Sequence, residues 1–314
     1  MTEDFTDIML PLKTPEEALA YPGPVHCYQD LRGHIDEILS HVEEHHDGSR
    51  RFRLSVDNYD YRVTRASTPA GDYLAMRRLL PNIRQLDDIG LPSEILRLLR
   101  SPGLSRGGLI IISGQAGHGK STTCASIIKD RLAKFGGVCN TVEYPVELMM
   151  TGMEGMGLCL QRNTETPEEF DESIADALRS YPSKSNNILY VGEILHSGIA
   201  ATVLKSAIDG HLVLTTMHAS GAITTLERIL ALASERISYD EARQLLASGL
   251  RMVVNQNLKT VRENTVFRAS YLIETDSVSR NIASGNSLKQ LSTDTRTLKE
   301  RLRNKQPLIA KFEK

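Results

Sequence analysis

A glycine-rich run, GQAGHGKS at residues 114–121, has the residue types and spacing of a phosphate-binding loop. It fits the pattern G-x-x-x-x-G-K-[ST] and lies between an apolar stretch and a stretch with helical character. Glycines let successive backbone N–H groups turn toward phosphate oxygens, and the N-terminus of the following helix adds positive potential. We therefore expect Lys120 to reach the β and γ phosphates of a nucleotide and Ser121 to ligate Mg²⁺.

ATP with Mg²⁺ is the expected ligand of this loop. A chance glycine-rich turn would explain neither the Lys120-Ser121 pair nor the apolar stretch at residues 109–113. His118 stands at a variable position of the pattern and needs no role of its own. The candidate nucleotide-binding residues of the loop are Gly114, Gly117, His118, Gly119, Lys120, Ser121 and Thr122.

Hydrolysis also requires a carboxylate near the metal and the attacking water. Glu193 follows the apolar residues 188–191 and so ends a predicted strand at the sheet edge where α/β proteins bind ligands, which makes it the first candidate for activating water. Glu143 and Glu147 follow another apolar stretch and could point into the same crevice. His218 lies past residues 212–216, where an imidazole could sense the γ-phosphate, contact a neighbouring subunit, or be merely structural.

The elements that must position these residues form an alternating pattern after about residue 100. Apolar stretches without polar alternation are typical of strands in a sheet that is covered on both faces. The predicted strands lie at residues 109–113, 138–142, 189–191 and 212–216, and the predicted helices at 122–133, from 167 onward, at 198–209 and at 298–314. Thr166 and Pro167 predict a capped helix start. We expect an α/β, P-loop, RecA-like C-terminal domain at residues 101–314 that ends in a helical region.

The first 100 residues predict a smaller α+β domain. Apolar residues at helix spacing predict a helix over 28–46, and alternation with a period of two predicts a hairpin that starts at residue 51. A third strand at 73–79 would complete a small antiparallel sheet. Residues 81–107 are predicted to be a connection with one short helix at 93–100.

The composition excludes several classes of protein. The chain has 314 residues, a net charge of −2 and 40% hydrophobic residues, as expected for an ordinary soluble protein. With 5% aromatic residues and no Trp, no direct nucleic-acid binding is expected. No apolar stretch approaches the length of a transmembrane segment, and the N-terminus does not resemble a secretory signal, so a cytoplasmic location is expected. The four cysteines include no C-x-x-C pair and predict neither a zinc site nor a redox motif.

Together these motifs resemble those of the secretion ATPase superfamily, which includes type IV pilus retraction and assembly motors, type II secretion ATPases and their type IV secretion relatives. The resemblance spans roughly residues 61–284. Residues 114–121 match the Walker A loop, 141–147 resemble the Asp box, 188–193 the Walker B strand and 210–218 the His box. Upstream, residues 61–63 and 78–81 resemble segments that contribute arginines, so Arg62 and Arg78 become candidate nucleotide-binding residues.

The resemblance implies a PilT-like motor. Members of the superfamily form hexameric rings, hydrolyse ATP between two domains and act on an inner-membrane platform of a pilus or secretion machine. It thus implies a homo-hexamer, a platform protein as partner, and a position at the cytoplasmic side of the bacterial inner membrane. Glu193, Glu143 and His218 are the implied catalytic residues.

The chain departs from the superfamily pattern at two places. Tyr144 replaces the Asp of the Asp box, and Leu195-His196 replaces an Arg-Asp pair that often follows the Walker B Glu. One alternative is therefore an ATP-binding subunit that does not hydrolyse ATP, and another is a monomeric P-loop kinase. Arg62 and Arg65 are three residues apart in a predicted strand, so their side chains point to opposite faces of the sheet and cannot both reach one phosphate without a bulge. Of the two, we favour Arg62 as the residue that contacts the nucleotide.

Overall fold

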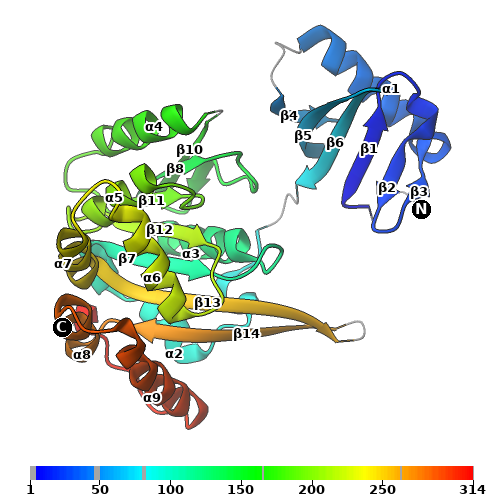
Figure 1. Cartoon of the computed structure of the whole chain (residues 1–314). Helices are drawn as coiled ribbons and strands as arrows, with labels where there is room; N and C mark the ends of the chain where they lie inside the picture. Colours follow the sequence, from blue (N-terminus) through cyan, green and yellow to red (C-terminus); the bar gives the residue numbers. More distant parts are fainter. Residues whose placement is uncertain (1–4, 46–49, 80–82, 165, 262–263, 314) are drawn as a thin grey trace. The chain divides into compact units, whose positions relative to one another are not determined.

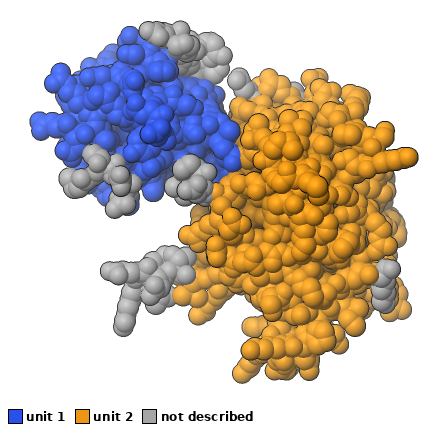
Figure 2. Space-filling view, turned by 180° about the vertical axis from the view of Figure 1, so that it is seen from behind, with its two compact units in different colours: residues 1–82, 147–149 blue, residues 83–146, 150–314 orange. Residues whose placement is uncertain are grey.

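The computed structural model describes residues 5–45, 50–79, 83–164, 166–261 and 264–313 (Figure 1). The chain forms two compact units, residues 1–82 with 147–149, and residues 83–146 with 150–314 (Figure 2). This division falls before the boundary near residue 100 that the sequence predicts. The reason is local packing: helix α2 (Ser93–Leu99) buries Ile95 and Leu98 in the second unit, and Arg100 forms an ion pair with Asp130 of the same unit.

The first unit is an antiparallel sheet with one long helix. Its strand order over the described residues is β3-β2-β1-β6-β5-β4. The elements are β1 (Asp7–Pro11), β2 (Leu19–Tyr21), β3 (Val25–His26), α1 (Tyr28–His45), β4 (Arg51–Val56), β5 (Tyr59–Thr68) and β6 (Gly71–Leu79). The predicted helix, hairpin and third strand are therefore confirmed over the described residues.

Alternation of side chains along the strands builds the core of the first unit. Ile8 and Leu10 of β1 are fully buried, while Met9 between them is exposed. Helix α1 packs Ile35 and Ile38 into the same cluster, together with Tyr61 of β5. A 3₁₀ turn (Pro15–Glu17) joins β1 to β2.

The second unit contains a larger sheet with the strand order β14-β13-β7-β12-β11-β8-β10-β9. The strands from β13 to β10 are parallel, and β14 and β9 pair antiparallel at the two edges. Their bounds are β7 (Gly108–Ser113), β8 (Gly137–Glu143), β9 (Gly152–Glu154), β10 (Gly157–Asn163), β11 (Asn187–Val191), β12 (Leu212–Met217), β13 (Leu250–Val261) and β14 (Asn264–Ile273). The predicted α/β sheet is confirmed.

Helices of the second unit pack on this sheet (Figure 1). Helix α3 (Lys120–Phe135) contacts β7, β8, β10 and β12. A second group of helices forms one core with residues of the strands, including Ile111, Leu189 and Val213. That group contains α4 (Pro167–Arg179), α5 (Ser197–Ser206), α6 (Ala222–Ala233), α7 (Tyr239–Gly249) and α8 (Asp276–Ala283). None of the helices in the described part of the chain is both long and apolar enough to cross a bilayer.

The start of α4 agrees with the sequence pattern, whereas the last helix does not have the predicted bounds. Thr166 caps α4 as predicted, since its Oγ1 accepts a hydrogen bond from the Glu169 backbone N–H at 3.2 Å. The predicted helix over residues 298–314 is confirmed for residues 298–303 only. Helix α9 (Leu291–Arg303) begins before residue 298 and ends at Arg303, and a 3₁₀ turn (Lys311–Glu313) follows it. Arg97 donates hydrogen bonds to the backbone oxygen of Leu308 and to Oε2 of Glu313, and Arg106 donates one to the backbone oxygen of Phe312. These bonds hold the segment after α9 in a conformation that is not an α-helix.

Candidate nucleotide site

The glycine-rich loop connects the end of β7 to the start of α3, so the predicted strand–loop–helix context is confirmed. Gly114, Gly117 and Gly119 have positive φ angles of 152°, 74° and 74°. Residues with a side chain rarely adopt these angles, so glycine is required for the path of this loop. A Cβ on Gly114 would lie 2.3 Å from the backbone oxygen of Gln256 in β13, which shows how closely the loop packs on its neighbouring strand.

Three of the residues singled out from the sequence contact one another beside this loop. Lys120 is buried at the first position of α3, and its Nζ donates to the backbone oxygen of Gln115 at 3.0 Å. The same Nζ lies 3.4 Å from Nδ1 of His218. Nε2 of His218 lies in turn 3.2 Å from Oε1 of Glu193. The structure thus connects the loop, the end of β12 and the end of β11 through these side chains.

The parallel sheet explains why residues so far apart in sequence meet. β7, β12 and β11 are adjacent parallel strands, so their C-terminal ends lie at one edge. The turn after β11 is fixed by two hydrogen bonds, from Ile194 N to Thr216 O at 3.1 Å and from Thr216 Oγ1 to Gly192 O at 2.6 Å. These bonds hold Glu193 in place, while its side chain keeps 30% of its surface exposed to solvent.

Glu143 occupies a different environment from Glu193. It is 3% exposed at the end of β8, and its Oε1 accepts hydrogen bonds from Thr141 Oγ1 at 2.7 Å and from Gln161 Nε2 at 2.9 Å. Its Cγ would lie 3.3 Å from a Cβ placed on Gly192, the residue before Glu193. Glu143 therefore lies next to the strand end that carries Glu193, in a buried and hydrogen-bonded position.

The first turn of α3 contains the remaining loop candidates. Ser121 and Thr122 are partly exposed there, and Gly117 is exposed in the loop before it. Cys124 of the same helix is fully buried, and burial, with a smaller contribution from the nearby Glu143 charge, raises the pKa of its thiol. Cys124 is therefore an inert thiol beside the site.

Gln256 is a site residue that the sequence analysis missed. Its Oε1 accepts a hydrogen bond from Thr123 Oγ1 at 3.0 Å, and its Nε2 donates to the backbone oxygen of His118 at 2.6 Å. The buried amide thus holds the loop to the first turn of α3. The available signal was the amide run at residues 255–257, which follows the apolar residues 252–254 and precedes Leu258, because a buried amide in a strand needs hydrogen-bond partners.

Arg62 and Arg78 belong to the first unit. Arg62 of β5 donates to Glu147 Oε1 at 3.0 Å, and Arg78 of β6 has its guanidinium carbon 4.2 Å from the centre of the Tyr59 ring. Arg65, the neighbour not favoured above, pairs with Asp72 at 2.7 Å. A role of Arg62 and Arg78 in nucleotide binding stays a prediction.

The residues of the loop fit a magnesium-bound polyphosphate. The left-handed glycines turn the backbone, a lysine begins the helix, and the first turn of α3 carries the Ser121 hydroxyl. Helix N-termini favour anions because their N–H groups and dipoles point toward the ligand. Serine and carboxylate oxygens are donors of the kind that Mg²⁺ prefers.

Comparison with known sequences identifies the family of this chain. Residues 34–303 match the type II/IV secretion system protein family. The uncharacterized protein YggR of Escherichia coli K12 is 30% identical over 243 residues, which are 76% of this chain and 71% of YggR. A twitching motility protein of Neisseria gonorrhoeae is 27% identical over 76% of this chain and 61% of its own length. The type IV pilus assembly ATPase PilB of Thermus thermophilus is 28% identical, and the match covers 62% of this chain and 21% of PilB.

Solved structures share the fold. The pilus retraction motor PilT with bound ADP is 22% identical, with a TM-score of 0.73 over 99% of this chain and 92% of that one. The ATPase DotB of Legionella pneumophila is 22% identical, with a TM-score of 0.70 over 98% and 90%. These likenesses confirm the predicted RecA-like fold with a smaller N-terminal domain. From the extent of the family match and from the similarity to YggR, the chain belongs to the type II/IV secretion system protein family, as its motifs predict.

Proposed function

We propose that this chain is an ATP-hydrolysing motor subunit of a type IV pilus or a type II/IV secretion machine. The observation that carries the proposal is the line of contacts from Lys120 through His218 to Glu193. It brings a phosphate-binding cation and a solvent-accessible carboxylate to the same edge of the sheet, and both are needed for hydrolysis at a phosphate loop.

Each residue has a defined part in this proposal. The loop amides and Lys120 hold the β and γ phosphates, and Ser121 holds Mg²⁺, which when bound offsets negative charge on the phosphates. Glu193 orients the attacking water through its exposed carboxylate. His218 is a positioning residue, because its Nε2 contacts Glu193 and its Nδ1 faces Lys120. Glu143 lies behind Glu193 and supports its strand end.

The assembly and partners are part of the same proposal. We propose a homo-hexameric ring at the cytoplasmic side of the inner membrane, acting on a platform protein and not on nucleic acid. Support comes from the resemblance of the motifs to the secretion ATPase superfamily and from relatives named as type IV pilus assembly ATPase PilB and type II secretion system protein E.

A Lys120→Ala variant tests the proposal. Loss of this charge should lower steady-state phosphate release by about 100-fold or more, as expected for loss of a main electrostatic contact to the transferred phosphate. Lys129→Ala is the matched control, because Lys129 lies on the same helix, is partly exposed and pairs with Glu154. Melting curves of both variants should stay close to that of the unaltered protein. Unchanged turnover in Lys120→Ala would refute the assignment.

A second candidate function is an ATP-binding subunit that does not hydrolyse ATP. Tyr144 favours it, because this residue packs against the core of the second unit and supplies no carboxylate where the superfamily has an Asp. Leu195 is 51% exposed and cannot replace a charged residue after Glu193. This function predicts phosphate release no higher than that of a Glu193→Gln variant.

A further inference from the structure

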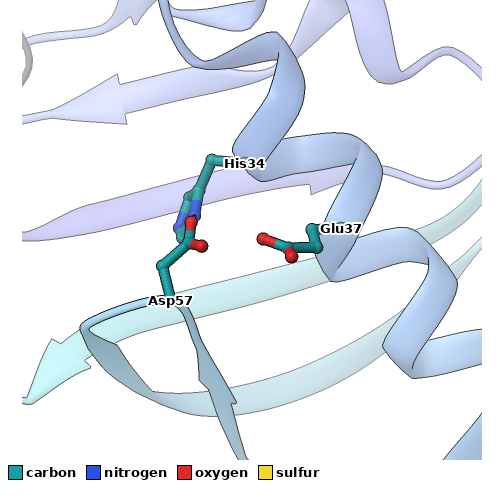
Figure 3. Close-up of side chains that lie close together, drawn as sticks. All are labelled: His34, Glu37 and Asp57. Carbon is teal, nitrogen blue, oxygen red and sulfur yellow. Dashed lines mark hydrogen bonds and ion pairs between the residues drawn. The ribbon is translucent and has the colours of Figure 1, made fainter.

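Three side chains with metal-binding atoms meet within the first unit (Figure 3). His34 and Glu37 are three residues apart on α1 and so share one face of the helix. Asp57 lies in the turn between β4 and β5. One ligand atom from each of the three side chains lies within 4.8 Å of the others. The cluster thus joins two separate elements of the unit.

The imidazole of His34 is held in a fixed orientation. Its Nε2 lies 2.7 Å from the hydroxyl of Tyr61, a fully buried residue of the core. Its Nδ1 lies 2.8 Å from Oδ2 of Asp57, and only 9% of the side chain is exposed. In metal-binding histidines a hydrogen bond to one ring nitrogen fixes the ring while the other nitrogen binds the metal. In His34 the contact of Nε2 with Tyr61 would fix the ring, and Nδ1, which now contacts Asp57, would be the metal ligand.

The charges around this imidazole are unbalanced. Glu37 is exposed and Asp57 is half exposed, and in the described residues neither carboxylate is within ion-pair distance of a lysine or an arginine. Other acids of the same sheet do have such partners: Asp60 pairs with Arg53 and Asp72 with Arg65, each at 2.7 Å. Two carboxylates that face one imidazole without an arginine leave negative charge that a divalent cation would offset.

We propose that His34, Glu37 and Asp57 bind a divalent zinc ion. One imidazole nitrogen and two carboxylate oxygens are zinc ligands, and zinc sites with three protein ligands keep a fourth position for water. A zinc ion at metal–ligand distances of about 2.0–2.2 Å would replace the direct 2.8 Å contact between His34 Nδ1 and Asp57 Oδ2. The ion would tie α1 to the β4–β5 turn. This site is independent of the proposed ATP site.

Zinc titration of the full chain tests the proposal. Calorimetry in excess Mg²⁺ should show one zinc equivalent that Glu37→Gln and Asp57→Asn each weaken by about tenfold or more. Asn is suitable at position 57 because its φ of +53° is one that Asn tolerates. Asp36→Asn is the matched control, since Asp36 is the exposed acid next to Glu37 on α1. It should keep the zinc affinity of the unaltered protein.

Thermal melting gives a second readout. Zinc should raise the melting temperature of the unaltered protein and of Asp36→Asn, and should raise it less in Glu37→Gln and Asp57→Asn, because only a ligand that binds the folded state more tightly stabilises it. Equal zinc affinity in all four proteins would overturn the proposal. An equal loss in Asp36→Asn would also overturn it, because the effect would then come from the general charge of α1.

Discussion

His218 connects the phosphate loop to the carboxylate at the end of β11, because its two ring nitrogens face different partners. Nδ1 is 3.4 Å from Lys120 and Nε2 is 3.2 Å from Glu193. Its backbone oxygen accepts a hydrogen bond from Arg228 at 2.9 Å, which fixes the chain at this point. A contact of this kind can orient Glu193 without binding the nucleotide itself.

The first prediction at the residue scale concerns this contact. His218→Gln should lower kcat for ATP hydrolysis by about tenfold or more, because Glu193 loses its imidazole partner, while the nucleotide Kd stays within about twofold. His211→Gln is the control, because His211 precedes β12 at its other end. An unchanged kcat in His218→Gln would contradict the assigned role.

The second prediction concerns pH and His211. Its ring stacks on Tyr181 with a centroid distance of 5.0 Å, and burial lowers its pKa below 6.5. As the pH falls, His211 therefore binds a proton at a higher pH in the unfolded chain than in the folded chain. The free energy of unfolding should thus fall as the pH drops through about 6.5. His211→Phe should lose less stability than the unaltered protein between about pH 8 and about pH 5. Urea unfolding at both pH values measures this, and an equal loss would contradict it.

Sequence patterns were sufficient for part of the site. The Lys120 position follows from a fixed motif, and Glu193 and His218 follow from their place at strand ends. Gln256 lies far from the phosphate loop in the sequence, and a single amide within a strand belongs to no recognisable motif. Its hydrogen bonds to Thr123 and His118 become visible only when β13 is placed beside β7. The environment of Glu143, with Thr141 and Gln161 as donors, could not be predicted for the same reason.

At the scale of elements, the packing of the phosphate loop on β13 leads to a third prediction. Gly114→Ala would bring a Cβ to 2.3 Å from the Gln256 backbone oxygen and should destabilise the fold by about 2 kcal/mol or more. At Gly117 an added Cβ meets no atom of the described residues within 4 Å, so Gly117→Ala should cost only about 1 kcal/mol for its positive φ. Urea unfolding compares the two variants. Equal losses would show that the contact with β13 is not rigid.

Strands that are apolar throughout were predictable, and strands without that pattern were not. β7 and β12 are buried at every position, so their sequences differ from those of their surroundings. The predicted helix at residues 198–209 begins as α5 but ends at Ser206, before Gly210, because a turn precedes the glycine. Helix ends are weakly marked in sequence, since fraying and 3₁₀ turns compete there.

Two groups of strands have sequences that do not indicate their structure. β1 to β3 carry or adjoin prolines such as Pro11 and Pro22, which interrupt the alternation that marks a strand. β13 and β14 form a long antiparallel hairpin at the edge of the sheet, and polar residues such as Asn255 and Gln256 lie within β13. Those side chains are satisfied by tertiary contacts, including Asn255 Nδ2 to Ser113 Oγ at 3.0 Å. Local patterns cannot report such contacts.

At the scale of the whole molecule, a fourth prediction separates a ring from a monomer. The proposed motor should form a hexamer in light scattering or native mass spectrometry, at least when ATP and Mg²⁺ are present. Ring formation is expected because motors of the superfamily that the motifs resemble act as hexamers. A monomer both with and without nucleotide would contradict the proposed assembly and favour a monomeric P-loop enzyme.

The machine that the proposed motor drives can be identified in the native host. Deletion of the encoding gene in the native host should abolish surface filaments, motility, or transfer of DNA or protein, according to the machine that the motor drives. Return of the unaltered gene should restore the lost trait, and return of a Lys120→Ala version should not. Restoration by the variant would show that the machine does not depend on the phosphate loop.

In the proposed function, ATP is hydrolysed at the phosphate loop, and Glu193 orients the attacking water. The most direct measurement is steady-state phosphate release by the assembled protein with saturating ATP and Mg²⁺, compared with Glu193→Gln purified in the same way. We expect the unaltered protein to release phosphate about 100-fold or more faster than the variant, with ATP bound by both. Equal release by the two proteins, with ATP still bound, would contradict it.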